Sequence, residues 1–211
     1  GSARNALDCA LWDWQAKQLG KPVWQLARLA EPKPVAIAYT LSLNTPEAMQ
    51  AEAAKQAHRP ILKIKLGTPD DMPRLEAVRR GAPRSTLIID ANEGWTPEIY
   101  ADLAPHLVRL GVALVEQPLP QGADDMLAEI ARPLPVAADE SAHDAASLAG
   151  LKGKYDVVNL KLDKTGGLTE ALRARAEVRR LGLGLMVGCM VGSSLAMAPA
   201  VLLAQGASYC D

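Results

Sequence analysis

Charged residues recur along this chain at the ends of short apolar runs. They are Lys65 in ILKIKLG, Asp90 in TLIIDAN, Glu116 in VALVEQP, Asp139 in PVAADES and Lys161 in VVNLKLD, with successive gaps of 25, 26, 23 and 22 residues. Such gaps approach the length of one strand-plus-crossover unit, about 30 residues or slightly less. In a parallel barrel, the carboxyl ends of all strands meet at one mouth. The pattern therefore predicts three carboxylates and at least two ammonium groups around one cavity.

The apolar runs belong to a regular alternation of strand and helix patterns. Helical stretches such as 46–58, 97–110 and 167–181 separate apolar runs that begin near Val35, Ile61, Thr86, Val112, Pro135, Tyr155, Leu183 and Ser208. Thr45-Pro46 and Thr96-Pro97 are typical of an N-cap followed by proline in the first helical turn. Eight strands alternating with seven helices predict an α/β fold, the TIM-type (β/α)8 barrel.

The first 30 residues have a different pattern from the rest. Residues 3–19 show helical periodicity with a broad apolar face, and Gly20 and Pro22 are typical of a helix end. Residues 190–204 read as a helix packed in the core. A typical barrel runs to about 250 residues. Since this chain of 211 residues opens within a helix and stops on the predicted eighth strand, we expect the barrel portion of a longer protein.

Composition excludes several classes of function. The net charge is −1 with both signs interspersed, which indicates neither a nucleic-acid partner nor an anionic membrane surface. The apolar runs are too short to cross a membrane, and the first residues lack the features of a secretory signal. The three cysteines, Cys9, Cys189 and Cys210, have no metal-type spacing. We therefore expect a reduced, cytoplasmic setting.

The three acidic strand ends predict a metal site. Asp90, Glu116 and Asp139 supply only hard oxygen ligands, which favours one Mg²⁺ ion. The alternative is that each acid caps a strand or pairs with a nearby cation, but this is a poor explanation for three consecutive strand ends. Asn92 and Glu140 lie beside the acids and could orient them.

Lysines on both sides of the acids predict proton transfer. Lys63 and Lys65 are two residues apart on one strand and share a face, so we expect each to lower the proton affinity of the other. Lys161 is four strands later, which suits removal of a proton from one face of a substrate and its return on the other. The alternatives are surface lysines and, for Lys161, a Schiff-base role; the three acids argue against the latter.

With these residues placed, the chain resembles the enolase superfamily, muconate-lactonizing subgroup, and within it the dipeptide epimerases of the L-Ala-D/L-Glu type. The resemblance extends over essentially the whole chain, and its carriers are KIKLG at 63–67, DANEGW at 90–95, VEQPLP at 115–120, ADES at 138–141, NLKLDKTGGLTEA at 159–171 and GCMVGSSLAMAPA at 188–200. It implies that residues 1–30 are the returning helix and linker of a largely absent capping domain, and that residues 31–211 are the barrel.

The resemblance also implies roles for individual residues. Asp90, Glu116 and Asp139 would bind Mg²⁺, and Lys65 and Lys161 would be the acid/base pair. Lys63 would assist at the substrate carboxylate, and Asp211 would be the first acid of an Asp-x-Asp pair that holds the ammonium of a dipeptide. The predicted substrate-binding group is Thr40, Lys63, Cys189, Val191 and Asp211.

The predicted reaction is Mg²⁺-dependent epimerisation of a dipeptide at the α-carbon of its C-terminal residue, by 1,1-proton transfer through an enediolate. Three sister reactions use the same half-reaction: cycloisomerisation, o-succinylbenzoate synthesis and N-acylamino-acid racemisation. A catalytically inactive barrel is the alternative of a different class. The resemblance implies a role in murein-peptide (peptidoglycan) recycling. The expected partners are a small dipeptide and further copies of the chain in a homo-oligomer, with no nucleic acid and no membrane.

Overall fold

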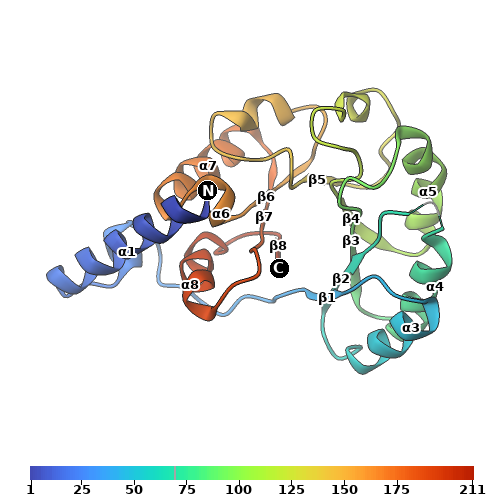
Figure 1. Cartoon of the computed structure of the whole chain (residues 1–211), viewed down its shortest axis with the longest axis horizontal. Coiled ribbons are helices and arrows are strands. Elements are labelled where there is room, and N and C mark those ends of the chain that lie inside the picture. The colour runs from blue at the N-terminus through green and yellow to red at the C-terminus, as the bar shows by residue number, and fades with distance from the viewer. Residues whose placement is uncertain (69) are drawn as a thin grey trace. The chain divides into compact units, whose positions relative to one another are not determined.

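A computed structural model describes residues 1–68 and 70–211. The chain divides into two compact units, and Figure 1 labels the elements of both. Unit 1 comprises Gly1–Val35, Ala142–Gly150 and Val158–Cys210. Unit 2 comprises Ala36–Ser141, Leu151–Val157 and Asp211.

Unit 2 is built on parallel strands that pair in chain order. Among its described residues they are β1 (Tyr39–Leu41), β2 (Ile61–Lys65), β3 (Thr86–Asp90), β4 (Val112–Glu116) and β5 (Val136–Ala138). The register aligns Lys65 with Asp90, and Asp90 with Glu116. Because aligned residues on neighbouring parallel strands point to the same face, these three side chains form one row across the sheet. The row predicted from sequence spacing is therefore present in unit 2.

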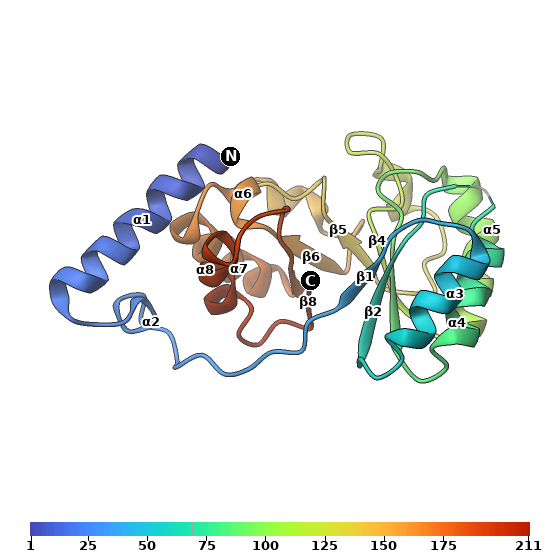
Figure 2. The ribbon, with the colours of Figure 1, turned by 60° about the horizontal axis from the view of Figure 1, so that its bottom comes forward.

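Three helices cover one face of these strands. They are α3 (Pro46–Lys55), α4 (Met72–Gly81) and α5 (Pro97–Arg109), and Figure 2 shows them side by side against the strands. Thr45 Oγ1 accepts a hydrogen bond from Ala48 N and Thr96 Oγ1 accepts one from Ile99 N, each at 3.3 Å. Both predicted N-caps are thus confirmed, and each is followed by a proline in the first turn.

The core of unit 2 lies along strands β2 to β4. The fully buried apolar side chains of these strands are Leu62, Ile64, Leu87, Ile88, Ile89, Leu114 and Val115. Strands buried on both faces read as continuous apolar runs rather than as an alternation of apolar and polar residues. A charged residue at the end of such an apolar run therefore indicates that the strand leaves the apolar core at that position.

Two of the seven predicted helices are wrong. Between β4 and β5 the chain forms only the 3-10 turn η1 (Asp125–Ala128), and before β6 only η2 (Ser147–Leu151). Prolines 118, 120, 133 and 135 flank the first segment and leave a short stretch that contains Gly122. Gly150 and Gly153 interrupt the second segment. A full α-helix is disfavoured in both because proline cannot continue a helix and glycine weakens one.

Unit 1 contains the remaining strands and the helices around them. Its elements are α1 (Ser2–Leu19), α2 (Val23–Leu26), β6 (Val157–Leu160), which begins at the unit border, α6 (Leu162–Thr165), α7 (Leu168–Leu181), β7 (Gly184–Val187), α8 (Ser194–Leu203) and β8 (Tyr209–Cys210). Strands β7 and β8 pair in parallel. Helix α1 ends at Gly20, whose positive φ of 60° confirms the predicted helix end.

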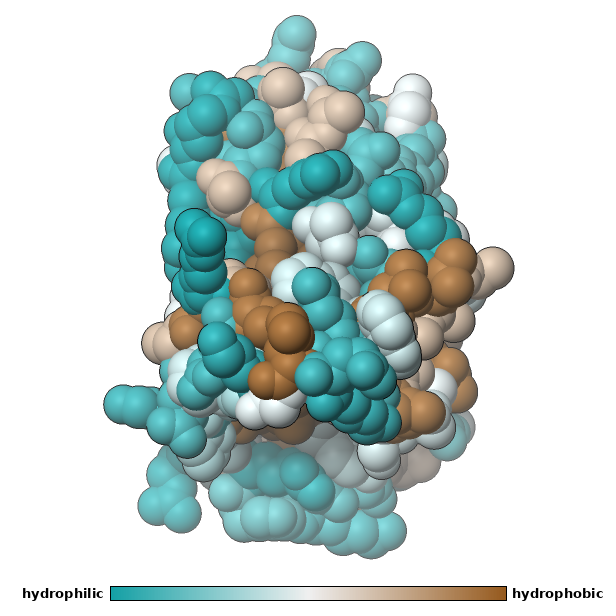
Figure 3. Space-filling view, turned by 90° about the vertical axis from the view of Figure 1, so that its left-hand side faces the viewer, coloured by the Kyte–Doolittle hydropathy of each residue, from teal (hydrophilic) through white to brown (hydrophobic). Residues whose placement is uncertain are grey.

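Helix α1 docks through polar side chains rather than through its apolar face. Trp12 Nε1 donates to Thr169 Oγ1 at 2.9 Å, and Asp8 Oδ2 accepts from Thr169 N at 2.9 Å. The apolar side chains Leu7, Leu11 and Trp14 are each more than half exposed. Apolar patches are visible among polar residues on the face shown in Figure 3. Within the described part of the chain, no helix combines the length and apolar character needed to cross a membrane.

The expectation that residues 190–204 pack in the core is also wrong. In α8 only Leu203 is buried, and Leu195 is 84% exposed. The helix is tied to α7 at its C-terminal end, where Arg175 donates to the Leu202 carbonyl at 3.2 Å. Its apolar composition therefore does not correspond to burial in this unit.

Candidate metal centre

Three buried carboxylates converge at the carboxyl ends of adjacent strands. Asp90 ends β3, Glu116 ends β4 and Asp139 directly follows β5. All three residues are buried, and one ligand oxygen from each lies within 4.8 Å of the others. Hard oxygen donors at this spacing suit Mg²⁺, which prefers carboxylates and keeps positions for water or substrate. The residues present thus fit the predicted cation.

Lys63 lies among the same carboxylates. Its Nζ is 2.8 Å from Glu116 Oε2, 3.0 Å from Asp90 Oδ2 and 2.7 Å from Asp211 Oδ2. Burial would lower the pKa of Lys63, but the negative charges of Glu116, Asp90 and Asp211 outweigh burial and raise it. The expectation that Lys65 lowers the proton affinity of Lys63 is therefore wrong, because carboxylates surround the Lys63 ammonium. Lys63 is a counter-ion of the acidic cluster.

Glu116 is the carboxylate most affected by its surroundings. Burial raises its pKa, the Lys63 ammonium opposes that shift, and the charges of Asp90 and Asp139 add to it. The result is a pKa of about 7. Burial is the main reason that this carboxyl group holds its proton near neutral pH, and the neighbouring carboxylates strengthen the effect.

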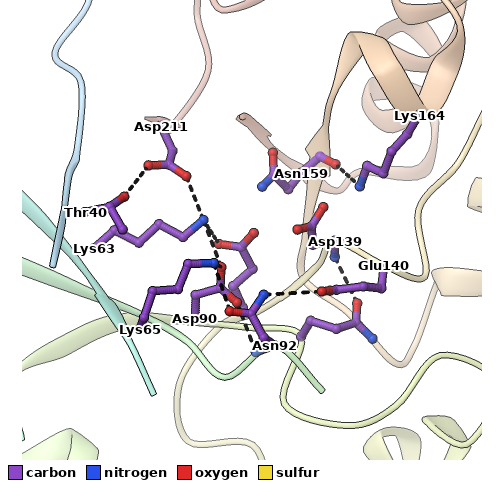
Figure 4. Close-up of polar contacts among 12 residues, drawn as sticks. Thr40, Lys63, Lys65, Asp90, Asn92, Asp139, Glu140, Asn159, Lys164 and Asp211 are labelled. Atoms are coloured by element: carbon purple, nitrogen blue, oxygen red, sulfur yellow. Dashed lines mark hydrogen bonds and ion pairs between the residues drawn. The ribbon is translucent and has the colours of Figure 1, made fainter. Parts of the chain in front are cut away.

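Lys65 is held at the edge of the cluster. Its Nζ donates to Asp90 Oδ2 at 2.7 Å and to Asn92 Oδ1 at 2.8 Å, as Figure 4 shows. Asn92 Nδ2 in turn donates to Glu140 Oε1 at 3.3 Å. The Lys65 side chain is 35% exposed, whereas that of Lys63 is 2% exposed. Of the two lysines on β2, Lys65 is therefore the more accessible to solvent.

The structure brings together three of the five residues predicted to bind substrate. Thr40 Oγ1 donates to Asp211 Oδ1 at 2.9 Å, and Lys63 binds the other oxygen of the same carboxylate. Thr40 and Lys63 are aligned on β1 and β2. Cys189 and Val191 belong to unit 1, after β7; Cys189 is half-buried and Val191 is fully exposed. The roles of all five stay predictions.

Lys161 belongs to unit 1, where it directly follows β6 and is buried. Gly188, at the end of β7, lies against its side chain. A Cβ atom added at Gly188 would be 3.1 Å from Lys161 Cε and 2.9 Å from both side-chain heteroatoms of Asn159. Because glycine has no side chain, position 188 leaves space for the side chains of Lys161 and Asn159. The acid/base role of Lys161 stays a prediction.

The sequence analysis assigned no role to Gln117, which the structure places beside the cluster. Gln117 follows Glu116 directly, is fully buried and accepts a hydrogen bond from Asp139 N at 2.9 Å. The sequence signal that could have identified Gln117 is its position directly after a predicted metal ligand. Its partner, however, lies 22 residues away in the sequence.

Comparison with known protein families covers most of the chain. Residues 44–210 match the family described as enolase C-terminal domain-like. Residues 1–27 match the N-terminal domain of mandelate racemase / muconate lactonizing enzyme. The alternating elements and the first of these matches confirm the predicted fold class, the barrel domain of the enolase superfamily.

Curated relatives with similar sequences are racemases and epimerases. The chain is 47% identical to an N-acetyl-D-glutamate racemase of a Pseudoalteromonas species, covering 100% of this chain and 67% of the relative. It is 45% identical to an L-Ala-D/L-Glu epimerase of Escherichia coli, covering 100% and 66%. The chain thus spans about two thirds of the length of these relatives.

Solved structures that resemble this chain include a dipeptide epimerase and a protein with homology to dipeptide epimerases. An enolase family member from Agrobacterium tumefaciens, with homology to dipeptide epimerases and with bound sodium and L-Ala-L-Glu, has a TM-score of 0.98 and 53% identity. The match covers 100% of this chain and 65% of that one. A dipeptide epimerase from Enterococcus faecalis, complexed with Mg and L-Leu-L-Tyr, has a TM-score of 0.93 and 30% identity, covering 99% and 62%.

Proposed function

We propose that this chain, which belongs to the mandelate racemase / muconate lactonizing enzyme family of the enolase superfamily, carries the active site of a dipeptide epimerase of the L-Ala-D/L-Glu type. The observation that carries the proposal is the buried triad Asp90, Glu116 and Asp139 with Lys65 hydrogen-bonded to its edge. Relatives that are epimerases, and solved relatives with bound dipeptides, support the substrate class.

The acidic triad would hold one Mg²⁺. When bound, the ion would supply Lewis-acid stabilisation of the negative charge that develops on the substrate carboxylate. Lys63 would remain protonated beside the triad and add positive charge on the same side. Thr40, Lys63 and Asp211 would line the substrate position, with Asp211 facing the dipeptide ammonium and Cys189 and Val191 contributing further contacts.

Lys65 and Lys161 would exchange the α-proton of the C-terminal residue. A neutral amine has two hydrogens and one lone pair. Because Lys65 has two acceptors, Asp90 Oδ2 and Asn92 Oδ1, both hydrogens of its neutral form would be engaged. The lone pair would then be available to take the α-proton, leaving an enediolate form of the substrate. Lys161 would return a proton from the other side, and the two lysines would swap roles in the reverse direction.

A second candidate is racemisation of an N-acylated amino acid, favoured by the 47% identity to an N-acetyl-D-glutamate racemase. The two substrates differ at the amine, which is charged in a dipeptide and acylated in the alternative. The Asp211 carboxylate suits the charged amine, because it offers a negative partner. Cycloisomerisation, o-succinylbenzoate synthesis and an inactive barrel remain further alternatives.

The deciding experiment is proton NMR in D₂O with Mg²⁺, using L-Ala-L-Glu and N-acetyl-L-Glu in separate samples. We expect the Glu α-proton signal of the dipeptide to disappear while the signals of L-Ala-D-Glu appear. Exchange with N-acetyl-L-Glu alone would favour the second candidate. Absence of exchange with both substrates, while Mg²⁺ still binds, would contradict catalysis by this chain.

Single-lysine variants test the two-base mechanism. Lys65→Ala and Lys161→Ala should each abolish epimerisation. If each lysine serves one face, the variants should differ in which epimer still exchanges its α-proton with solvent. Lys152→Ala, at an exposed lysine of the loop before β6, is the matched control and should behave like the wild type. Wild-type epimerisation by Lys161→Ala would rule out its role as a base.

The wider setting is part of the proposal. We place the reaction in the cytoplasm, in peptidoglycan recycling, and expect a homo-oligomer. We also propose that residues 1–30 are the returning helix and linker of a capping domain and that residues 31–211 are the barrel. The family matches at 1–27 and 44–210 support this division.

A further inference from the structure

The side-chain amide of Gln117 is saturated with hydrogen bonds. Its Oε1 accepts from Asp139 N at 2.9 Å and from Ser141 N at 3.2 Å. Its Nε2 lies 2.9 Å from the Leu119 carbonyl, from Ser141 Oγ and from Tyr155 OH, so these three acceptors share its two N–H groups. Every one of these bonds is buried. One side chain thus ties the residue after β4 to the residue after β5.

The chemistry of the donors fixes the direction of these bonds. A backbone N–H can only donate, so the Gln117 oxygen must face Asp139 and Ser141, and its nitrogen must face the hydroxyl groups. The hydroxyls of Ser141 and Tyr155 therefore accept from Gln117 and donate to Asp124 Oδ2, at 2.6 and 2.7 Å. Asp124 is the final acceptor.

Asp124 is itself buried and held by a cation. Lys154 Nζ lies 2.7 Å from Asp124 Oδ1. Burial would raise the pKa of Asp124, but hydrogen bonds from Lys154, Ser141 and Tyr155 outweigh burial and lower it. Asp124 is thus an ionised anchor, and the network runs from it through two hydroxyls to the amide of Gln117.

The backbone at Gln117 is constrained as well. Its φ of 37° lies in the left-handed region, which residues with a side chain rarely adopt. Its N–H donates to the Ala137 carbonyl at 2.8 Å, and its carbonyl accepts from Glu93 N at 2.9 Å. Such a conformation persists where the surroundings hold it, and it occurs often at functional sites.

We propose that Gln117, anchored through Ser141 and Tyr155 on Asp124, is a positioning residue that fixes the spacing of the Glu116 and Asp139 carboxylates. Glu116 is its neighbour in the chain and Asp139 is its hydrogen-bond partner, so a shift of the amide moves one ligand relative to the other. The inference rests on the proposed function only in taking these carboxylates as metal ligands. Residues that orient metal ligands typically change metal affinity about 10- to 100-fold when removed.

The test is metal affinity in variants that remove one hydroxyl each. Ser141→Ala and Tyr155→Phe leave both ligands and Gln117 in place. Ser85→Ala is the matched control, because Ser85 is also buried in unit 2 and its hydroxyl donates to the Arg59 carbonyl at 2.9 Å, before the start of β3. Mn²⁺ titration of the metal-free chain by calorimetry would give the Kd. We expect Mn²⁺ binding at least about 10-fold weaker in both network variants and within twofold of the wild type in Ser85→Ala.

A second readout needs no metal. Amide hydrogen exchange of Asp139 in the metal-free protein should be faster in Tyr155→Phe than in the wild type and unchanged in Ser85→Ala. If Ser141→Ala does not fold, Tyr155→Phe decides. Wild-type Mn²⁺ affinity in the folded network variants would overturn the inference. Weakened Mn²⁺ binding in a chain that exchanges no dipeptide proton would support the inference and overturn the proposed function, and a wild-type chain that binds no Mn²⁺ would overturn both.

Discussion

At the scale of single residues, the site is a cluster of carboxylates and lysines whose charges act on one another. Four carboxylates, Asp90, Glu116, Asp139 and Asp211, lie with the ammonium groups of Lys63 and Lys65 in unit 2. Among these six residues the carboxylates outnumber the ammonium groups, and a divalent cation held by the triad would add positive charge to the cluster. The raised pKa of Glu116 comes first from burial, and the negative charges of Asp90 and Asp139 add to it.

Metal affinity should therefore depend on pH. Because the pKa of Glu116 is about 7 without metal, cation binding must displace its proton at lower pH. We expect the Kd for Mn²⁺ to be constant above about pH 8 and to increase roughly tenfold for each pH unit below 7. Calorimetric titrations between pH 5.5 and 8.5 would measure this. A Kd that does not change across pH 7 would contradict the assignment of Glu116 as the proton-linked ligand.

Removal of the Lys63 ammonium should destabilise the metal-free fold. In Lys63→Met the buried carboxylates lose their counter-ion, and loss of one partner of a buried ion pair costs about 3–5 kcal/mol. Urea unfolding in EDTA would measure the difference from the wild type, which we expect to become smaller when Mg²⁺ is added. The control is Lys17→Met, whose side chain is 73% exposed and pairs with Asp13. Its effect should stay below about 1 kcal/mol.

At the scale of elements, function depends on how strand ends are aligned. The register that places Lys65, Asp90 and Glu116 in one row is a consequence of parallel pairing between β2, β3 and β4. The helices on the outer face hold that pairing, and their starts at Thr45 and Thr96 were predictable because capping is local chemistry. The 3-10 turns η1 and η2 were not predicted, although the prolines around η1 and the glycines around η2 are local signals that disfavour an α-helix.

The end of β7 offers a test of the predicted role of Lys161. Gly188→Ala would place a methyl group too close to Asn159 and against Lys161 Cε, so both side chains would shift. We expect kcat to fall about tenfold or more with a small change in KM, since a displacement of about 1 Å in a reacting group can cost 10²-fold. Gly150→Ala is the control, because a Cβ there meets nothing within 4 Å. Unchanged kcat in Gly188→Ala would contradict the placement of Lys161 at the reacting carbon.

At the scale of the whole molecule, the apolar residues of unit 1 are not all buried. Leu195 and Leu203 lie in the same helix, yet Leu195 is 84% exposed and Leu203 is fully buried. We expect Leu203→Ala to lower the free energy of unfolding by about 2–5 kcal/mol, and Leu195→Ala to change it by less than about 0.5 kcal/mol. Urea unfolding of the two variants would measure this. Equal losses would show that the exposed face of α8 is buried in solution.

The sequence by itself determined the alternation of strands and helices, the positions of Asp90, Glu116 and Asp139 at strand ends, and the choice of a hard divalent cation. These follow from local periodicity and from the rule that parallel strand ends meet at one edge. Only the tertiary structure decided that carboxylates surround Lys63, that Glu116 holds a proton near neutral pH, and that Gln117 links β4 to β5. The physical reason is that burial and Coulomb energy depend on distances between residues that are 20 to 150 positions apart in the chain, and such distances have no signature in the local sequence.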